Sequence, residues 1–260
     1  MAKPWTEAAT AFLWLSRLPV AGLLARAPVP LARAAWAFPL VGLVLGGFAG
    51  LVLMLAAWLG LPPGVAALLA VAVLVLGTGA LHEDGLADYC DGCGGATTVR
   101  ALEIMRDSRI GSYGVLGLVL VTGLRVAAIA SAAEAGSLYA ATAVLAAAAL
   151  SRAGMVAALR LMRPARPDGL GHGAGRPSGA GVLLAWGLGA ACLLVPASLT
   201  PAPVAAVAAA LATCAAAQLW LGWRANRRLG GQTGDVLGAL QQLGETATLL
   251  ALVALRPMLA

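Results

Sequence analysis

Hydrophobic residues occur in long runs that short polar segments interrupt. Each run holds about twenty apolar residues, the length that an α-helix needs to cross a hydrocarbon core of about 30 Å. The pattern predicts an all-α polytopic bundle of about six to eight transmembrane helices. We expect these helices near residues 36–59, 65–81, 112–132, 138–160, 179–199, 204–223 and, on a weaker pattern, 236–255.

The first 35 residues have a different pattern, in which aromatic residues are mixed with basic residues and prolines. No uninterrupted apolar core precedes a small-residue cleavage site, so the segment does not resemble a signal peptide. We expect residues 4–16 to form an amphipathic helix at the membrane interface, with Trp5 and Trp14 at the level of the lipid headgroups. Nothing divides the remaining pattern, so residues 1–260 are expected to form one integral membrane domain.

The linkers between the runs alternate in charge. Those around residues 61–64, 133–136 and 200–203 contain no basic residue, whereas the other linkers and the amino-terminal segment hold fourteen of the seventeen Lys and Arg residues. By the positive-inside rule, the basic linkers are cytoplasmic. Apart from Glu134, Glu245 and the borderline Asp235, the acidic residues lie on this same side, so polar chemistry is expected to face the cytosol.

Composition excludes a soluble globular protein, because 61% of the residues are hydrophobic and only 11% are charged. The net charge of +6 is spread over several linkers, and topology explains it better than a nucleic-acid partner does. The four cysteines are expected to be reduced thiols. Cys90 and Cys93 have metal-like spacing, but no second ligand pair follows them. The pattern neither requires nor excludes a homo-oligomer.

Acidic residues are concentrated in one window, residues 82–114, which holds six of the eleven in the chain. If residues 80–92 are helical, three aspartates of this window share one face, and two further acids repeat the four-residue spacing after a Gly-Gly turn. Clustered carboxylates repel unless a cation lies between them, and hard oxygen ligands select Mg²⁺ or Mn²⁺. The predicted metal ligands are Asp84, Asp88, Asp91, Glu103 and Asp107.

Glycines and arginines complete the predicted chemistry of this window. Gly85 and Gly92 each follow an aspartate and leave room for a phosphate or another helix. Arg106 and Arg109 flank Asp107 and are suited to clamp phosphate oxygens. Metal and arginine beside a membrane indicate phosphoryl or diphosphate chemistry. The alternative is a solvated acidic loop whose carboxylates pair with arginines.

Two further segments support an enzyme. Residues 227–238 form a glycine-rich turn that carries Thr233 and Asp235 to the start of an apolar run, where phosphate or metal is commonly held. Residues 167–178 form a glycine-rich cytoplasmic loop, which either closes over a substrate or is a plain linker.

Three polar residues lie within or next to predicted spans. Arg152 is costly in lipid, and we expect it to face the polar site. Arg125 either does the same or extends towards a membrane boundary. His82 precedes the acidic helix, where it is a metal ligand, a base or a structural hydrogen-bonding residue.

Three ordered motifs resemble those of the adenosylcobinamide-GDP ribazoletransferase family, also called cobalamin synthase. They are His-Glu-Asp-Gly-Leu-Ala-Asp-Tyr-Cys-Asp-Gly at residues 82–92, Ala-Leu-Glu-Ile-Met-Arg-Asp-Ser-Arg-Ile-Gly-Ser-Tyr-Gly at 101–114, and Leu-Gly-Gly-Gln-Thr-Gly-Asp-Val-Leu-Gly-Ala at 229–239. The resemblance also includes residues 16–20 and 38–42 and thus runs over essentially the whole chain. Glu83 departs from it, since the family usually has an apolar residue there.

The resemblance implies a Mg²⁺-dependent enzyme of a bacterial or archaeal cytoplasmic membrane (the cell inner membrane), with its active site facing the cytosol. Such enzymes transfer GDP-activated adenosylcobinamide onto α-ribazole or its 5′-phosphate, release GMP and form adenosylcobalamin or its 5′-phosphate.

Together, the resemblance and the predicted chemistry give each residue an expected role. The expected catalytic residues are Asp84, Asp88 and Asp107, the last as a further ligand or as the base. The expected substrate- and phosphate-binding residues are His82, Gly85, Arg106, Ser108, Arg109, Arg152, Thr233 and Asp235.

Three other classes fit the sequence less well. CDP-alcohol phosphatidyltransferases have Ala-Arg soon after their first Asp-Gly, where this chain has Ala87-Asp88. Aromatic prenyltransferases need a tighter aspartate box than Glu83, Asp84 and Asp88 provide. A cation-coupled transporter predicts acids near the bilayer midplane, whereas these acids cluster beside a cytoplasmic linker.

Overall fold

The computed structural model describes residues 4–23 and 28–256, and within these ranges it contains helices and no strand, as predicted. The long helices are α3 (Phe38–Trp58), α4 (Pro63–Thr78), α7 (Ser112–Ala135), α8 (Ser137–Leu161), α10 (Gly179–Cys192), α12 (Pro203–Leu229) and α13 (Gly234–Ala254). The shorter helices are α1 (Pro4–Leu15), η1 (Ala21–Leu23), α2 (Leu31–Ala34), η2 (Ala35–Ala37), α5 (Leu81–Gly92), α6 (Thr98–Ile104), α9 (Leu170–Gly173) and α11 (Leu194–Ser198).

Among the described residues, six helical stretches are long and apolar enough to cross a membrane, or up to seven if the bent pair of α4 and α5 counts as one span. The predicted helix count is therefore confirmed, including the weakest run, which is α13. The run at 65–81 differs from the prediction, because α4 ends at Thr78 and the chain turns by 90° into α5. Gly79 and Ala80 both adopt left-handed backbone angles at this bend, and Gly79 does so at no steric cost.

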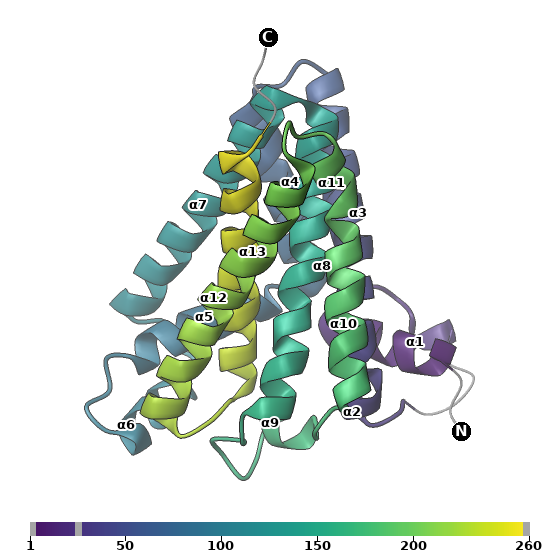
Figure 1. Cartoon of the computed structure of the whole chain (residues 1–260). Helices are drawn as coiled ribbons and strands as arrows, with labels where there is room; N and C mark the ends of the chain where they lie inside the picture. Colours follow the sequence, from purple (N-terminus) through teal and green to yellow (C-terminus); the bar gives the residue numbers. More distant parts are fainter. Residues whose placement is uncertain (1–3, 24–27, 257–260) are drawn as a thin grey trace.

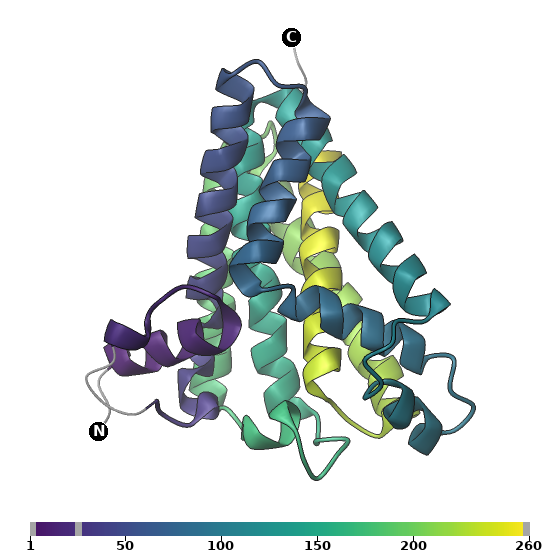
Figure 2. The same ribbon diagram turned by 180° about the vertical axis from the view of Figure 1, so that it is seen from behind.

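The linkers separate at the two ends of the bundle as their charge predicts. Figures 1 and 2 show α2, α6 and α9 at one end, together with the turn between α12 and α13. The linkers without basic residues, which join α3 to α4, α7 to α8 and α11 to α12, lie at the opposite end. The end that holds α6 and α9 is called the basic end below.

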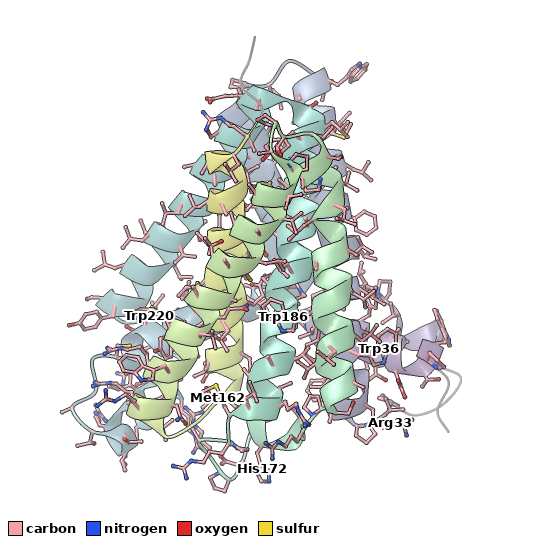
Figure 3. All side chains as sticks on the ribbon, in the orientation of Figure 1. Arg33, Trp36, Met162, His172, Trp186 and Trp220 are labelled. Carbon is pink, nitrogen blue, oxygen red and sulfur yellow. The ribbon has the colours of Figure 1, made fainter. Side chains whose placement is uncertain are left out.

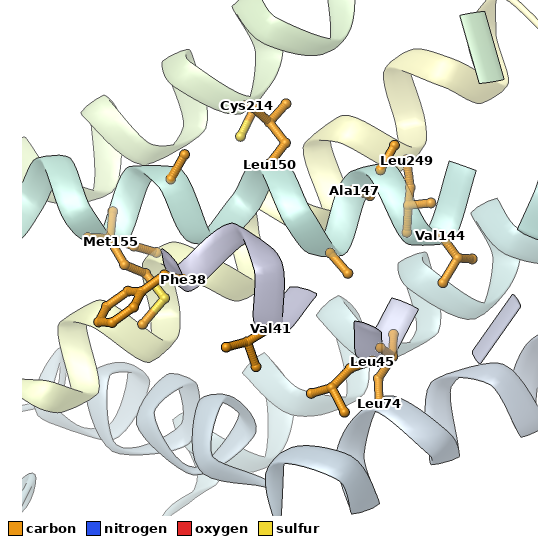
Figure 4. Packing of buried hydrophobic residues seen from close by; sticks show 14 of the residues in the cluster. Phe38, Val41, Leu45, Leu74, Val144, Ala147, Leu150, Met155, Cys214 and Leu249 are labelled. Atoms are coloured by element: carbon orange, nitrogen blue, oxygen red, sulfur yellow. The ribbon is translucent and has the colours of Figure 1, made fainter. Parts of the chain in front are cut away.

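Helix α8 is the centre of the bundle, and 83% of its most apolar window is buried. It packs closely on α3 because small residues face each other. A methyl group added at Gly42 of α3 would lie 2.1 Å from the carbonyl oxygen of Ala148, and Gly46 and Gly50 have similarly tight contacts with α8. Figure 4 shows Phe38 of α3 beside Met155 of α8, and Leu150 beside Cys214 on the opposite face of α8.

Helix α1 confirms the predicted helix at residues 4–16, although its place at the membrane interface remains a prediction. It is held to the start of the bundle by Glu7, which accepts hydrogen bonds from Arg33 and from the Trp36 indole, both at 2.9 Å. The basic residues Lys3 and Arg26 of the amino-terminal segment lie outside the described residues.

Candidate functional site

Helix α5 presents the predicted acidic face. The structure confirms a helix over Leu81–Gly92, close to the range that the sequence indicated. Along it Asp84 is exposed, Asp88 is half-buried and Asp91 is buried. Figure 2 shows α5 lying across the bundle and passing in front of α13. Because the chain bends by 90° after α4, the acidic residues lie on a helix that crosses the bundle and does not run parallel to the long helices.

A close crossing of α5 and α13 brings acids from distant parts of the chain together. A methyl group added at Gly85 would lie 3.0 Å from both the Cα and the carbonyl oxygen of Asp235. At Gly238, one turn further along α13, it would lie 3.1 Å from the carbonyl oxygen of His82. The space at Gly85 thus admits a second helix, one of the two uses that its position suggested. As a result, Asp88 lies within electrostatic range of Asp235.

Arg166, in the loop after α8, is the cation that accompanies these acids. Its guanidinium lies 3.9 Å from the Asp235 carboxylate and donates a 3.0 Å hydrogen bond to the carbonyl oxygen of Leu102. Its Nε is buried and has no hydrogen-bond partner among the described residues. The acidic face formed by Asp84, Asp88 and Asp235, together with Arg166, is called the acid site below.

The start of α13 forms one wall of a small pocket beside the acid site. Thr233 caps the helix by accepting a 3.2 Å hydrogen bond from the Val236 amide, and its hydroxyl also contacts the Asp235 carboxylate at 3.2 Å. The pocket has a volume of about 90 Å³, and Arg166 and His172 contribute to its walls. A helix amino terminus with an arginine opposite favours bound phosphate.

Asp91 is used differently from the other two aspartates of α5. Its carboxylate accepts hydrogen bonds from the backbone amides of Gly111 at 2.7 Å and Gly114 at 2.8 Å. These amides belong to the first turn of α7, which has no other side-chain cap. Both oxygens of Asp91 are therefore engaged in holding α5 to the start of α7.

The acids of the second predicted set, Glu103 and Asp107, pair with arginines at the surface. Glu103 lies 3.1 Å from Arg100, and Asp107 lies 2.6 Å from Arg109. Hydrogen bonds from Arg109 lower the pKa of Asp107 to about 2. Glu103 and Asp107 thus match the alternative that the sequence left open, in which the carboxylates of a solvated loop pair with arginines.

The phosphate clamp predicted beside Asp107 is not assembled at the acid site. Arg106 pairs with Asp168 at 2.5 Å, and Ser108 and Arg109 are exposed. Across residues 4–23 and 28–256 no three His, Cys, Asp or Glu side chains form a ready-made metal cluster. The five predicted metal ligands therefore lie in three separate places. Asp84 and Asp88 belong to the acid site, Asp91 holds the start of α7, and Glu103 and Asp107 pair with surface arginines.

A buried polar network lies inside the bundle, next to the acid site. Arg125 of α7, which is only 1% exposed, contacts Glu83 at 3.1 Å, Gln242 at 2.8 Å and Glu245 at 2.6 Å. Gln241 links Glu245 to α8 through a 3.1 Å hydrogen bond to Ser151. Helices α5, α7, α8 and α13 are thereby tied together by polar contacts.

His82 and Arg152 belong to this interior and not to the acidic face. Their side chains are 2% and 1% exposed, respectively. Arg152 donates to the carbonyl oxygen of Ala148 at 2.7 Å, within its own helix. The Nε2 atom of His82 and the Nε of Arg152 are buried without a hydrogen-bond partner among the described residues. Both side chains are therefore buried in the interior of the bundle, His82 from α5 and Arg152 from α8.

Several polar residues of these sites were not singled out from the sequence. Arg166 was counted only among the basic linker residues, and Gln232 lay within a motif without a role. Glu245 is a single charge within a predicted span, and that was a usable signal, since such a charge usually pairs with another buried charge, here Arg125. All four cysteines are free, as predicted.

Comparison with known proteins identifies the family. The model of the family described as cobalamin-5-phosphate synthase matches residues 7–253. A protein of Bradyrhizobium diazoefficiens, named adenosylcobinamide-GDP ribazoletransferase, is 46% identical over 93% of this chain and 90% of its own length. Proteins with the same name from Azorhizobium caulinodans and Brucella canis are 45% and 43% identical, over 95% and 89% of this chain and 95% and 94% of their own lengths.

No solved structure matches the chain. The family match extends over all the helices that form the acid site and the buried network. The chain belongs to the cobalamin-5-phosphate synthase family.

Proposed function

We propose that the chain is an adenosylcobinamide-GDP ribazoletransferase. It transfers GDP-activated adenosylcobinamide onto α-ribazole or its 5′-phosphate, releases GMP and forms adenosylcobalamin or its 5′-phosphate. The family match and the names of the relatives support this activity. The structural observation that carries the proposal is the crossing of α5 and α13 at Gly85, which gathers carboxylates and an arginine beside a helix amino terminus. Phosphoryl transfer depends on such positioned charges.

The reaction forms one bond and breaks one at the phosphorus atom attached to adenosylcobinamide. A ribose hydroxyl oxygen of the acceptor attacks this phosphorus, and the bond to the oxygen that leaves with GMP breaks. The hydroxyl proton passes to a carboxylate, for which we propose Asp88, because it is half-buried on the acidic face. The low pKa of Asp107, about 2, argues against that residue as the base.

Arg166 and the start of α13 are proposed to hold the diphosphate. The guanidinium of Arg166 lines the small pocket and lies 3.9 Å from the Asp235 carboxylate, so it can neutralise charge on the departing phosphate. Thr233, Gly234 and Asp235, at the start of α13, also line this pocket, where the helix dipole favours an anion. Arg106 and Arg109 form closer ion pairs, at 2.5 and 2.6 Å, and are left out of this role.

Mg²⁺, with Mn²⁺ as an alternative, fits the acid site by the chemistry of its donors. Asp84, Asp88 and Asp235 supply hard carboxylate oxygens, and among the described residues only Arg166 forms an ion pair with any of them. Mg²⁺ is usually bound by one or two carboxylates together with waters and substrate phosphates, so a protein cage of three is not needed. When bound, the ion would neutralise diphosphate oxygens. Asp91 is omitted from the set because both of its oxygens are engaged.

We also propose that the acid site faces the cytosol from the cytoplasmic membrane of a bacterium. The acid site lies towards the basic end of the bundle, and the positive-inside rule assigns that end to the cytoplasm. Nucleotide-activated substrates are found in the same compartment.

The decisive experiment measures GMP release by the full chain in nanodiscs, from adenosylcobinamide-GDP and α-ribazole. Asp84→Asn and Asp88→Asn should each lower the rate at least about 100-fold. Glu103→Gln is the matched control, since this exposed acid pairs only with Arg100, and its rate should stay within about threefold of wild type. Wild-type protein that releases no GMP, or aspartate variants with normal rates, would contradict the proposal.

A further inference from the structure

A second, larger pocket lies at the basic end, next to the acid site. It has a volume of about 370 Å³ between the end of α8, the loop around α9 and the turn before α13. Arg163, His172, Arg176 and Gln232 form its polar walls, and Leu159 and Met162 form part of its apolar wall. Figure 3 shows Met162 and His172 at this end of the bundle. It is called the arginine pocket below, and none of the predicted site residues lines it.

The charge of this pocket differs from that of the acid site, because no carboxylate lines it. Arg163 is held by a 2.7 Å hydrogen bond from its Nε to the carbonyl oxygen of Gly230, and Arg176 by a 2.6 Å bond from its Nε to that of Arg160. Within the part of the chain that the structure describes, the terminal nitrogens of these two arginines donate no hydrogen bond. Two positioned guanidinium groups without an acidic partner favour a bound phosphate.

The arginine pocket and the small pocket of the acid site share a wall. Gly171, His172 and Gln232 line both, and Asp235 lines the small pocket only three residues beyond Gln232. Gln232 is 2% exposed and donates a 2.9 Å hydrogen bond to the carbonyl oxygen of Gly171. Its amide oxygen is buried and accepts no hydrogen bond from the described residues. A molecule held at the arginines therefore lies next to the acid site, with Gly171, His172 and Gln232 between the two pockets.

We propose that Arg163 and Arg176 of the arginine pocket bind the 5′-phosphate of the acceptor and thereby set the affinity for α-ribazole 5′-phosphate. This inference rests on the proposed function and deepens it. A phosphomonoester carries about two negative charges at neutral pH and matches two guanidinium groups. The phosphate takes no part in the bond changes and serves to position the ribose hydroxyl towards the acid site.

Kinetics with the two acceptors tests the assignment, because they differ only in this phosphate. In Arg163→Ala and Arg176→Ala, the KM for α-ribazole 5′-phosphate should rise about tenfold or more, which corresponds to one lost charge-assisted contact. The KM for α-ribazole should stay unchanged, so the preference between the acceptors should shrink. Arg176→Lys should recover part of the affinity, because it restores the charge. Arg227→Ala is the matched control, since Arg227 is an exposed arginine at the same end that lies over the Trp223 ring.

Three outcomes would overturn the assignment. An equal rise in KM for both acceptors would show that the arginines only support the fold. A rise confined to the KM of adenosylcobinamide-GDP would place the donor diphosphate in the arginine pocket. Equal wild-type kinetics with both acceptors would show that the phosphate is not recognised. Wild-type protein that reacts with neither acceptor would instead refute the proposed function.

Inhibition of the wild-type protein gives a test that does not depend on the folding of a variant. Ribose 5-phosphate should compete with α-ribazole 5′-phosphate, and ribose should be a much weaker inhibitor. Equal inhibition by the two sugars would contradict a phosphate site.

Discussion

At the scale of single residues, the partners of a carboxylate decide whether it serves structure or chemistry. Asp84, Asp88 and Asp91 lie on one helix and are spaced as three equivalent ligands would be. Asp91 nevertheless has both oxygens on the first turn of α7, whereas Asp84 is exposed. Helical spacing therefore predicted that the three aspartates share one face of α5. It did not predict that the start of α7 packs against Asp91 at one end of that face.

Replacement of Asp91 tests whether this residue caps α7 or binds a metal ion. Asp91→Ala removes both hydrogen bonds to α7 and should lower the free energy of unfolding by about 1–2 kcal/mol. Asp91→Asn keeps one acceptor oxygen and should cost about half as much. Thermal unfolding in detergent measures the loss, and a Mg²⁺ titration of activity gives the second readout. A marked increase in the Mg²⁺ requirement of Asp91→Asn would make Asp91 a ligand after all.

At the scale of helices, glycines set the distances between the elements that carry the site. The α5–α13 crossing at Gly85 and Gly238 joins motifs that lie far apart in the sequence. In the same way, the missing side chain of Gly42 lets α3 pack closely on α8. The acid site is thus positioned by backbone contacts between helices and not by its own side chains alone.

Gly85→Ala should separate α5 from α13. The added methyl group would lie 3.0 Å from Asp235 backbone atoms, which have little room to move, and overpacking of this kind costs about 1–3 kcal/mol. Turnover should fall about tenfold or more, since small displacements of positioned groups are costly. Gly123→Ala is the matched control, because nothing lies within 4 Å of its added methyl group. Similar turnover in the two variants would show that the crossing does not position the site.

The stability of the protein should depend on the balance of charges in the buried network. Arg125→Ala leaves Glu83 and Glu245 buried without their cation, which should cost about 3–5 kcal/mol. Adding Glu245→Gln to that variant removes one unpaired charge and should recover part of the loss. Thermal unfolding of the single and double variants measures the coupling, and additive losses would contradict a direct interaction.

At the scale of the whole molecule, the proposed sites lie towards one end of the bundle. The acid site, the arginine pocket and the basic linkers all lie towards this end, and the opposite end holds three linkers without basic residues. The proposed sites therefore predict that water-soluble substrates approach from one side of the membrane only.

Cysteine labelling tests this orientation. Cys93 is exposed after α5, so a membrane-impermeant maleimide should label it in inverted membrane vesicles but not in right-side-out vesicles. In a Cys93→Ser background, Leu61→Cys at the opposite end should show the reverse pattern. Labelling of Cys93 from outside intact cells would place the acid site on the wrong side for cytosolic substrates.

The sequence predicted the helices and their two ends because run length and linker charge are local properties. It also predicted roles for Asp84, Asp88 and Asp235, which the structure brings together where α5 crosses α13. The bend between α4 and α5 was missed, since Ala80 gives no sign of the left-handed angle that it adopts. Neither the pairing of Arg106 with Asp168 nor the position of Arg166 was predictable, because both depend on contacts between distant segments.

The buried network also bears on how the protein is made. Arg125 enters the membrane with α7, but Glu245 lies 120 residues later, in α13. Until α13 arrives, Glu83 is the only acidic partner in the network for the Arg125 guanidinium. Because an arginine in lipid is costly, α7 gains its full anchoring only after α13 has been made. A chain that stops before α13 should therefore be poorly integrated and removed by membrane quality control.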